Sequence, residues 1–341
     1  MPPLVSVIIP CRNEAKTIDR VLEALDGQTF GRDRMEVIVA DGRSEDDSRA
    51  RVEGFARDHP ALQVTVVDNP GLTAPAGLNQ AWRAAHGEFV LRVDGHAVPR
   101  PDYIERCVSL LERTGCDGVG GAWDILPGAR GAIASAIAAA AGHPLGAGGT
   151  RYRLGGSAGE VDTVPFGAYR RSAIERLGGF NEAVPVNEDY EFNYRLRQTG
   201  GRLLFSPEIR STYIARPTLA ALARQYFRYG LQKTVMLSFH PAALRPRQAA
   251  PALWVALLLA LAIGAIFTPL ARILLAAFAL AYAAVLLAAG ILRAARLRAA
   301  GMVWALPLAL ASMHIAWGLG FWWGWFGVAR RVRGARAPSG R

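Results

Sequence analysis

The C-terminal part of this 341-residue sequence lacks acidic residues, since no Asp or Glu follows Gln248. Nine Arg give that part a charge of +9, and the remaining 30 basic and 28 acidic residues leave residues 1–248 at only +2. A nucleic-acid-binding domain concentrates basic residues on its folded module, so the total of +11 does not indicate a nucleic-acid partner. Arginines that flank apolar segments are better explained by anionic membrane lipids.

Charged residues are also absent from three long stretches, 249–271, 273–292 and 299–329. Each is longer than the roughly 18 apolar residues that indicate a transmembrane helix. We therefore predict about three spans after a soluble domain. The expected division is 1–218 for the soluble domain, 219–248 for amphipathic helices at the membrane surface, 249–329 for the transmembrane region and 330–341 for a basic tail.

Cysteine is scarce, and neither a disulfide framework nor a zinc site is expected. Cys11, Cys107 and Cys116 have no paired or metal-like spacing, so we expect single buried thiols in a reducing cytosol. The N-terminus, Met1-Pro2-Pro3, leads into the first apolar run without the basic region of a signal peptide. We therefore expect the soluble domain to stay on the side of the membrane where it is made.

Short β-branched runs alternate with helical patterns in the first hundred residues. Continuous apolar runs predict strands buried on both faces, and the spacing of Ile18, Val21, Leu22 and Leu25 predicts a helix. The β-α-β-α-β-α-β order predicts an α/β fold with a doubly wound, mostly parallel sheet. The expected strands are 5–9, 37–40, 64–67 and 89–93, and the helices between them begin near residues 18, 48 and 75.

Three of these strands end in polar residues: Arg12-Asn13-Glu14, Asp41 to Asp47, and Asp94 to His96. Ligands of such sheets bind beyond the carboxyl ends of the strands, so the three groups indicate one shared site.

The later part of the soluble domain is less regular. Residues 122–159 are rich in Gly, Ala and Pro, a composition typical of a mobile segment that covers a site. We expect a strand within 161–170 and a helix that begins near Asn187. Residues 219–239 mix aromatic, apolar and basic residues and predict an amphipathic helix at the membrane surface.

Asp94-Gly95-His96 is a candidate metal site. Two side chains one residue apart on an irregular strand end can reach the same divalent cation, which would bridge the phosphates of a nucleotide diphosphate. The alternative is a simple turn, because Asp-Gly is a common turn pair and His96 can be merely exposed.

Glu188-Asp189 begins a helical pattern and is a candidate catalytic base. A helix N-terminus favours an ionised carboxylate, which a general base must be at neutral pH. The alternative is structural, since acidic residues favour a first helical turn for the same electrostatic reason.

Gln225-Tyr226-Phe227-Arg228-Tyr229 lies shortly before the first apolar stretch. Gln225 and Arg228, one helical turn apart and flanked by aromatic rings, can hold a diphosphate beside a sugar. The alternative is an interfacial helix whose Arg228 contacts lipid phosphates.

Taken in order, these motifs resemble the family 2 glycosyltransferases. The series is Pro10-x-Arg12-Asn13-Glu14, Asp41-Gly42-Arg43-Ser44-x-Asp46-x-Ser48, Leu78-Asn79, Arg92-x-Asp94-Gly95-His96, Asn187-Glu188-Asp189 and Gln225-x-x-Arg228-Tyr229. The resemblance spans about residues 4–235 and implies a GT-A fold, a nucleotide-diphosphate sugar donor and inversion at the anomeric carbon. The Asp-x-His-Ala triplet, residues 187–197 and the Arg-Tyr-Gly run are similar to the succinoglycan-type glucosyltransferases, which implies glucose transfer to a lipid-linked oligosaccharide in the bacterial inner membrane.

The resemblance also implies a role for each matching residue. The nucleotide-sugar site would comprise Pro10, Arg12, Glu14 and Asp41 around uracil and ribose, with Ser44, Asp46, Asn79 and Asp94. Asp94 and His96 match the family's Asp-x-Asp metal motif, which implies a divalent cation, Mn²⁺ or Mg²⁺. Asp189 matches the general base with Glu188 in support, and Gln225, Arg228 and Tyr229 match the Gln-x-x-Arg-Trp element at the diphosphate or acceptor.

Two residues depart from the family pattern. His96 replaces the second Asp and makes the metal site less anionic, and Tyr229 replaces the Trp of polymerising synthases, which weakens the case for processivity.

We therefore expect an inverting glycosyltransferase that moves glucose from UDP-glucose onto a lipid-linked saccharide. The expected location is the inner (plasma) membrane, with several spans and a cytosolic catalytic domain. A nucleotidyltransferase is a rival, but it would show a Gly-rich basic loop after the first strand. A non-catalytic membrane scaffold is another rival, but it would have little need for both Asp94 and Asp189.

The arginines also bear on topology. With a cytosolic domain, Arg245 and the group after the second stretch, 293–298, lie inside. If 299–329 is one long span, which we expect because two crossings need roughly 40 residues, the basic tail lies outside, against the positive-inside preference. The alternative is a chain that folds back near Pro307 or Gly318.

Overall fold

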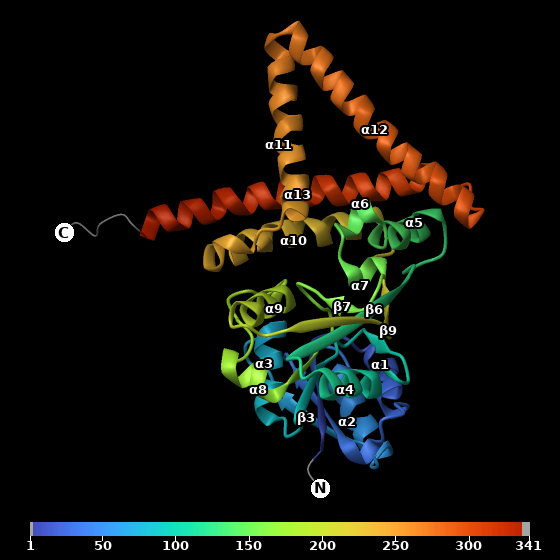
Figure 1. Cartoon of the computed structure of the whole chain (residues 1–341), viewed down its shortest axis with the longest axis vertical. Helices are drawn as coiled ribbons and strands as arrows, with labels where there is room; N and C mark the ends of the chain where they lie inside the picture. The colour runs from blue at the N-terminus through green and yellow to red at the C-terminus, as the bar shows by residue number, and fades with distance from the viewer. Residues whose placement is uncertain (1–2, 336–341) are drawn as a thin grey trace, which may run out of the picture. The chain divides into compact units, whose positions relative to one another are not determined.

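The computed structural model describes residues 3–335, which divide into two units (Figure 1). The sheet unit comprises Met1–Asp124 and Thr150–Tyr213, and the helical unit comprises Ile125–Gly149 and Ile214–Arg341. Residues 125–149 fall inside the range 1–218 expected for the soluble domain, yet they group with the C-terminal helices. Residues 336–341, the end of the expected basic tail, lie outside the described residues.

Within the described residues, nine strands form one sheet in the order β3-β2-β1-β4-β8-β6-β9-β5, with β7 paired to β9. The strands are β1 (Val5–Cys11), β2 (Met35–Asp41), β3 (Gln63–Asp68), β4 (Phe89–Arg92), β5 (Val98–Pro99), β6 (Gly118–Leu126), β7 (Gly159–Glu160), β8 (Ala168–Arg170) and β9 (Leu203–Ile214).

The first four strands are parallel, as the sequence predicts. Cys11, the last residue of β1, pairs with Asp41, the last residue of β2, so the two following loops begin at the same edge of the sheet. Strands β1 and β2 are buried along nearly their whole length, which explains their uninterrupted apolar runs. The α/β prediction is confirmed.

The other half of the sheet is antiparallel. Strand β8 pairs with both β4 and β6, and β5 and β7 pair with β9. The strand expected within 161–170 is limited to Ala168–Arg170. The mostly parallel order therefore holds for the first half of the sheet only.

Helices cover both faces of the sheet. Ile18, Val21, Leu22 and Leu25 of α1 are all fully buried, so the helical spacing correctly identified the face that packs on the sheet. One buried cluster lies under α1, α2 and α4, and a second lies under α3, α8 and α9. The helices of this unit are α1 (Ile18–Asp26), α2 (Ser48–Asp58), α3 (Ala74–Ala84), α4 (Tyr103–Thr114), α7 (Arg151–Leu154), α8 (Arg171–Leu177) and α9 (Glu188–Gln198).

The helical unit consists of an inserted segment and the C-terminal helices. The insertion carries α5 (Ala132–Ala141) and α6 (Pro144–Ala147), and the C-terminal part carries α10 (Leu219–Phe239), α11 (Pro246–Phe267), α12 (Pro269–Leu297) and α13 (Met302–Ala335). Three of these helices are long and apolar enough to cross a membrane: α11, α12 and the Met302–Gly327 part of α13. Helix α13 continues through Pro307 and Gly318, so the chain does not fold back at either position.

Candidate active site

The loops after β1 and β2 are joined by hydrogen bonds from backbone to side chain. Glu14 N donates to Ser48 Oγ at 2.7 Å, and Ala15 N donates to Asp46 Oδ2 at 3.1 Å. Asn13 crosses the gap in the other direction, because its Oδ1 accepts a hydrogen bond from Glu45 N at 2.8 Å. The two polar groups that the sequence assigns to one site therefore form one connected surface.

Most residues assigned to the nucleoside pocket lie on this surface. Asp41 is buried, and its carboxylate accepts a hydrogen bond from Ser44 N at 3.3 Å. Ser44 Oγ accepts one from Asn13 N at 3.0 Å, and exposed Arg12 packs against Gly42, where an added Cβ would lie 3.3 Å from that of Arg12. Pro10 lies one residue before the end of β1.

Asn79 does not join this group. Its Nδ2 donates to Phe180 O at 2.9 Å and to Glu182 Oε1 at 2.7 Å, and its Oδ1 accepts from Phe180 N at 2.8 Å. A buried amide used in this way holds the turn after α8 against α3. Asn79 therefore has a structural role here, and we remove it from the candidate nucleotide-sugar residues.

Arg92, at the end of β4, connects the two acidic motifs. Its Nε donates to Asp94 Oδ1 at 2.9 Å, and its Nη2 donates to Glu188 Oε1 at 2.6 Å. Arg92 and Glu188 are buried, and the remaining guanidinium nitrogen, Nη1, is buried with no hydrogen-bond partner among the described residues. Arg92 thus joins Asp94 to Glu188, which lies 96 positions after Arg92 in the sequence, and keeps one donor available.

The charges of this cluster shift the pKa values of its carboxyl groups in opposite directions. Burial raises the pKa of Glu188 to about 7; Arg92 lowers it, whereas Asp189 and Asp94 raise it further. Burial also raises the pKa of Asp189, with Arg92 opposing the shift. Burial would raise the pKa of Asp94 too, but Arg92 and then His96 outweigh it, so the pKa of Asp94 is lowered. Asp94 is therefore the most acidic member.

Glu188 and Asp189 begin α9, as the sequence predicts. Asn187 precedes them with a φ of 67°, a conformation that Asn tolerates better than most residues. Further along the helix, Asn193 accepts a hydrogen bond from Tyr169 Oη at 2.8 Å and donates to Val164 O at 3.0 Å. These buried contacts fix α9 to the sheet and so fix the carboxylates at its first turn.

His96 lies beside Glu14. Its Nδ1 is 3.0 Å from Glu14 Oε1, and Gly95 allows this approach because an added Cβ there would lie 3.0 Å from Glu14 Cγ. No group of three or more His, Cys, Asp or Glu in the described part of the chain is arranged to hold a metal ion. The Asp94–His96 pair still fits a two-ligand site, because a ligating imidazole usually donates its other ring N–H to a carboxylate.

Gln225, Arg228 and Tyr229 lie on α10 in the helical unit. Gln225 Nε2 donates to Tyr229 Oη at 2.9 Å, and Arg228 is exposed. The Gln-x-x-Arg-Tyr element is therefore formed on one helical turn.

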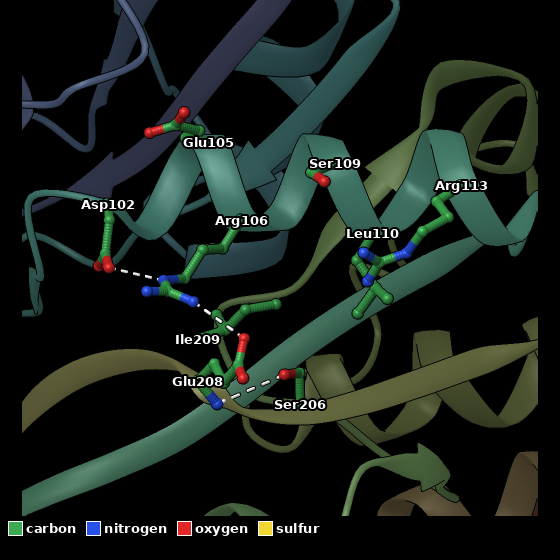
Figure 2. Close-up of a pocket in the computed structure, with 9 residues that line it drawn as sticks. All are labelled: Asp102, Glu105, Arg106, Ser109, Leu110, Arg113, Ser206, Glu208 and Ile209. Carbon is green, nitrogen blue, oxygen red and sulfur yellow. Dashed lines mark hydrogen bonds and ion pairs between the residues drawn. The ribbon is translucent and has the colours of Figure 1, made fainter.

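A surface pocket of about 370 Å³ lies elsewhere in the sheet unit, between α4 and β9 (Figure 2). Its lining includes Arg106, which pairs with Asp102 at 2.6 Å and with Glu208 at 2.9 Å. None of the candidate site residues lines it. We do not assign it to the reaction.

Residues 6–178 match the glycosyl transferase family 2 domain, which is just over half of the chain. The chain belongs to glycosyl transferase family 2. It is 31% identical over 328 residues to the succinoglycan biosynthesis protein ExoA of Rhizobium meliloti, and the match covers 96% of each chain. The family membership and the enzyme class, a glycosyltransferase, are thus confirmed.

A second relative supports this assignment, and a solved structure shows the fold. A dolichyl N-acetyl-alpha-D-glucosaminyl phosphate 3-beta-D-2,3-diacetamido-2,3-dideoxy-beta-D-glucuronosyltransferase of Methanococcus voltae is 26% identical over 240 residues, 68% of this chain and 74% of the relative. The structure of the mannosyltransferase PcManGT from Pyrobaculum calidifontis, in complex with GDP-Man and Mn²⁺, superposes with a TM-score of 0.59 at 23% identity and covers 92% of this chain and 88% of that one. This likeness confirms the GT-A fold.

Arg92 is the site residue whose role the sequence did not reveal. It stands in the motif Arg92-x-Asp94, but its partner Glu188 lies 96 residues away. The signal that could have pointed to it is a charged residue at the end of an otherwise apolar, fully buried strand, because a buried Arg requires a paired carboxylate.

Proposed function

We propose that this glycosyltransferase moves a sugar from a nucleotide-diphosphate donor to an acceptor hydroxyl with inversion at the anomeric carbon. The observation that carries the proposal is the cluster in which Arg92 joins Asp94 to Glu188, with Asp189 next in the helix. It provides one half-buried carboxylate, Asp189, as a base and a second carboxylate, Asp94, whose pKa is lowered by Arg92. Inversion needs one base and no enzymic nucleophile, which this set satisfies.

In the proposed step, Asp189 accepts the acceptor hydroxyl proton while that oxygen forms a bond to the anomeric carbon. The bond from this carbon to the diphosphate oxygen breaks, and its electron pair leaves with the nucleoside diphosphate. Glu188 is occupied by Arg92, which leaves Asp189 as the base. The raised pKa of Asp189 strengthens it as a proton acceptor.

Asp94 and His96 are the residues that would hold a divalent cation. Such an ion, when bound, neutralises the negative charge that develops on the departing diphosphate. The support is the acidic Asp94 and the orientation of His96 by Glu14. Arg12, Asp41, Ser44 and Asp46 on the joined loops would hold the nucleoside, and Gln225, Arg228 and Tyr229 are proposed to act on the diphosphate or acceptor.

For the donor and acceptor we propose UDP-glucose and a lipid-linked saccharide at the inner membrane, with the catalytic unit in the cytosol. The support is the similarity to a succinoglycan biosynthesis protein and the three apolar helices. Turnover with UDP-glucose should exceed turnover with GDP-mannose at least about 10-fold, since the two donors differ in both base and sugar.

The test of the mechanism is Asp189→Asn. We expect donor binding near that of the wild type and turnover at least about 100-fold lower, because the amide cannot accept the proton. Asp58→Asn, the same change at an exposed position of the sheet unit, is the matched control and should keep full activity. Near-wild-type turnover in a folded Asp189→Asn enzyme would overturn the assignment of the base.

A further inference from the structure

Helix α13 is covered by protein to a much greater extent than the other two apolar helices. Among its most apolar 18 residues 44% are buried, against 11% in α11 and 17% in α12. An added Cβ at Gly320 would lie 2.1 Å from Phe227 O of α10, and one at Gly324 would lie 2.9 Å from Leu231 O. Both contacts advance by four residues in the same direction, so α10 and α13 run parallel and side by side (Figure 1).

Helix α10 is unsuited to the interior of a membrane. Its 21 residues do not qualify as a candidate span, and Arg224 and Arg228, one turn apart, are exposed. A helix with one basic face and one apolar face lies in the plane of the interface, where Arg meets lipid headgroups. A neighbour that follows it in parallel lies at the same depth.

The N-terminal half of α13 contacts the inserted segment. An added Cβ at Gly301 would lie 2.9 Å from that of Ala132 in α5, and His314 Nε2 lies 2.9 Å from Leu145 O in α6. Helix α5 has ten residues, about 15 Å at 1.5 Å per residue, and is too short to cross the roughly 30 Å hydrocarbon core.

The inserted segment and α10 enter the helical unit together. Ala215 N donates to Leu126 O at 2.8 Å, so the chain segments that lead to α5 and α10 are hydrogen-bonded where they leave the sheet unit. Both helices are therefore on the same side of the membrane. Contacts to them extend from Gly301, the residue before α13, to Gly324 within it, a distance of about 35 Å at the helical rise. A crossing helix would carry one of these ends to the opposite side.

Helices α11 and α12 behave differently. In the described residues, the buried positions of α11 are Ala252 and Val255, near its start, and those of α12 fall between Leu286 and Ala294, near its end. The part between them exposes large apolar side chains, namely Leu257, Leu259, Ile263, Ile266, Phe267, Leu270, Ile273, Leu274 and Leu280. The two helices thus form a hairpin (Figure 1) that protein covers at its base only.

We propose that α11 and α12 cross the bilayer as a hairpin, whereas α13 lies along the membrane surface beside α10 and α5. The C-terminus is then on the same side as the sheet unit, in place of the single third span expected from sequence. This arrangement puts Arg245, Arg247, Arg293, Arg296, Arg298, Arg330, Arg331 and Arg333 on one side and leaves Arg272 at the tip of the hairpin. Such an asymmetry is what the positive-inside preference requires, and the surface arginines attract anionic headgroups.

The test is the sidedness of labelling by a membrane-impermeant maleimide in vesicles of known orientation that contain the full chain. Three variants are compared: Ser339→Cys near the C-terminus, Leu270→Cys at the exposed hairpin tip, and Asp58→Cys in the sheet unit. The native Cys11, Cys107 and Cys116 are at most 3% exposed and should not react in the folded protein. We expect Ser339→Cys to be labelled from the side that labels Asp58→Cys, and Leu270→Cys from the opposite side.

Labelling of Ser339→Cys from the side of Leu270→Cys, or only after detergent is added, would overturn the surface position of α13. Labelling of Leu270→Cys from the side of Asp58→Cys, or only after detergent is added, would overturn the crossing hairpin. The readout is independent of turnover, so failure of this topology and failure of the proposed sugar transfer are told apart.

Discussion

The two units of this glycosyltransferase bury different kinds of surface. The sheet unit buries charged and polar side chains in hydrogen-bonded pairs: Ser6 Oγ donates to Glu36 Oε1 at 2.6 Å, and Arg92 bridges two carboxylates. In the helical unit the close contacts are made by glycine, as where an added Cβ at Gly230 would lie 2.1 Å from Trp317 O. One unit is held by apolar burial and paired charges, the other by backbones that approach closely.

The difference shows what each unit needs from its surroundings. The sheet unit removes its large apolar side chains from water within its own core. In the helical unit Ile266, Phe267 and Leu280 remain 70%, 76% and 71% exposed, and the bilayer proposed above would cover them. Small residues at the helix contacts fit this environment, because helices in lipid associate through close packing.

Loss of Arg92 should have the largest effect. Arg92→Met leaves Glu188 buried without a counter-ion, which costs about 3–5 kcal/mol of stability, and removes the group that aligns the two acidic motifs. We expect turnover to fall at least about 100-fold, measured as release of nucleoside diphosphate.

Two further variants separate folding from function at this position. Arg92→Lys keeps the charge but loses the fork that reaches both carboxylates, so it should be stable and still at least about 10-fold slower. Arg92→Met combined with Glu188→Gln should regain stability without regaining turnover. Full activity of the double variant would show that the bridge serves folding only.

The matching test in the helical unit is Gly320→Val. A side chain there would clash with the carbonyl of Phe227 in α10, and helix backbones cannot shift as a flexible side chain can. We expect a loss of about 1–3 kcal/mol or more, seen as a lower Tm of the purified protein in detergent. Gly327→Val is the matched control, since nothing lies within 4 Å of an added Cβ there. Equal Tm values for the two variants would contradict glycine-mediated packing.

The sequence predicts best those parts of the fold whose signal is local. Strands β1, β2 and β4 show mainly apolar runs because both of their faces are covered, and α10 has the expected bounds, Leu219–Phe239. Strand β6 was not predicted, because side chains from other elements pack against its glycines. An added Cβ at Gly118 would lie 2.6 Å from the Tyr169 ring, and one at Gly120 would lie 2.5 Å from Val164 Cβ. Such a strand shows no apolar alternation, since its partners supply the apolar atoms.

The candidate site also contains parts that the sequence predicts and parts that it does not. The loops after β1 and β2 are predictable because parallel strands in register end at one edge. The role of Arg92 is not, because it depends on where Glu188 of a distant helix is placed. Part of the segment 122–159, expected to be a mobile cover, is helix α5, whose alanines are buried in the helical unit. The sequence did not predict this helix, because a helix without a polar face shows no amphipathic periodicity.

The pH dependence of kcat tests the role of the carboxyl pair Glu188–Asp189 in the sheet unit. Because burial raises the pKa of Asp189, as it raises that of Glu188, the acid limb of kcat should lie at a higher pH than an ordinary carboxylic acid would give. Glu188→Gln removes a negative charge beside Asp189, so the pKa of Asp189 should decrease and the acid limb should move down by about one pH unit. Glu112→Gln, an exposed carboxyl on α4, should leave the limb in place. If the acid limb of kcat did not move in Glu188→Gln, the base would not belong to the pair Glu188–Asp189.

The smallest expected effect concerns His96 and the choice of metal. Because Glu14 lies 3.0 Å from Nδ1, we expect that nitrogen to carry the proton and Nε2 to face the cation together with Asp94. Imidazole is softer than a carboxylate and favours Mn²⁺ over Mg²⁺, so His96→Asp should lower the ratio of Mn²⁺- to Mg²⁺-supported turnover about 3- to 10-fold. His96→Gln, which keeps a polar side chain without a second charge, should weaken both activities and is the control for loss of a ligand.

The carboxylate introduced by His96→Asp also lies beside Glu14 and would repel it. His96→Asp is therefore compared with His96→Asp combined with Glu14→Gln, which removes that repulsion. The same reduced ratio in both proteins would place His96 at the metal, because repulsion from Glu14 changes donor binding for either cation alike. An unchanged ratio would leave Asp94 as the protein ligand and give His96 the role of holding the loop after β1.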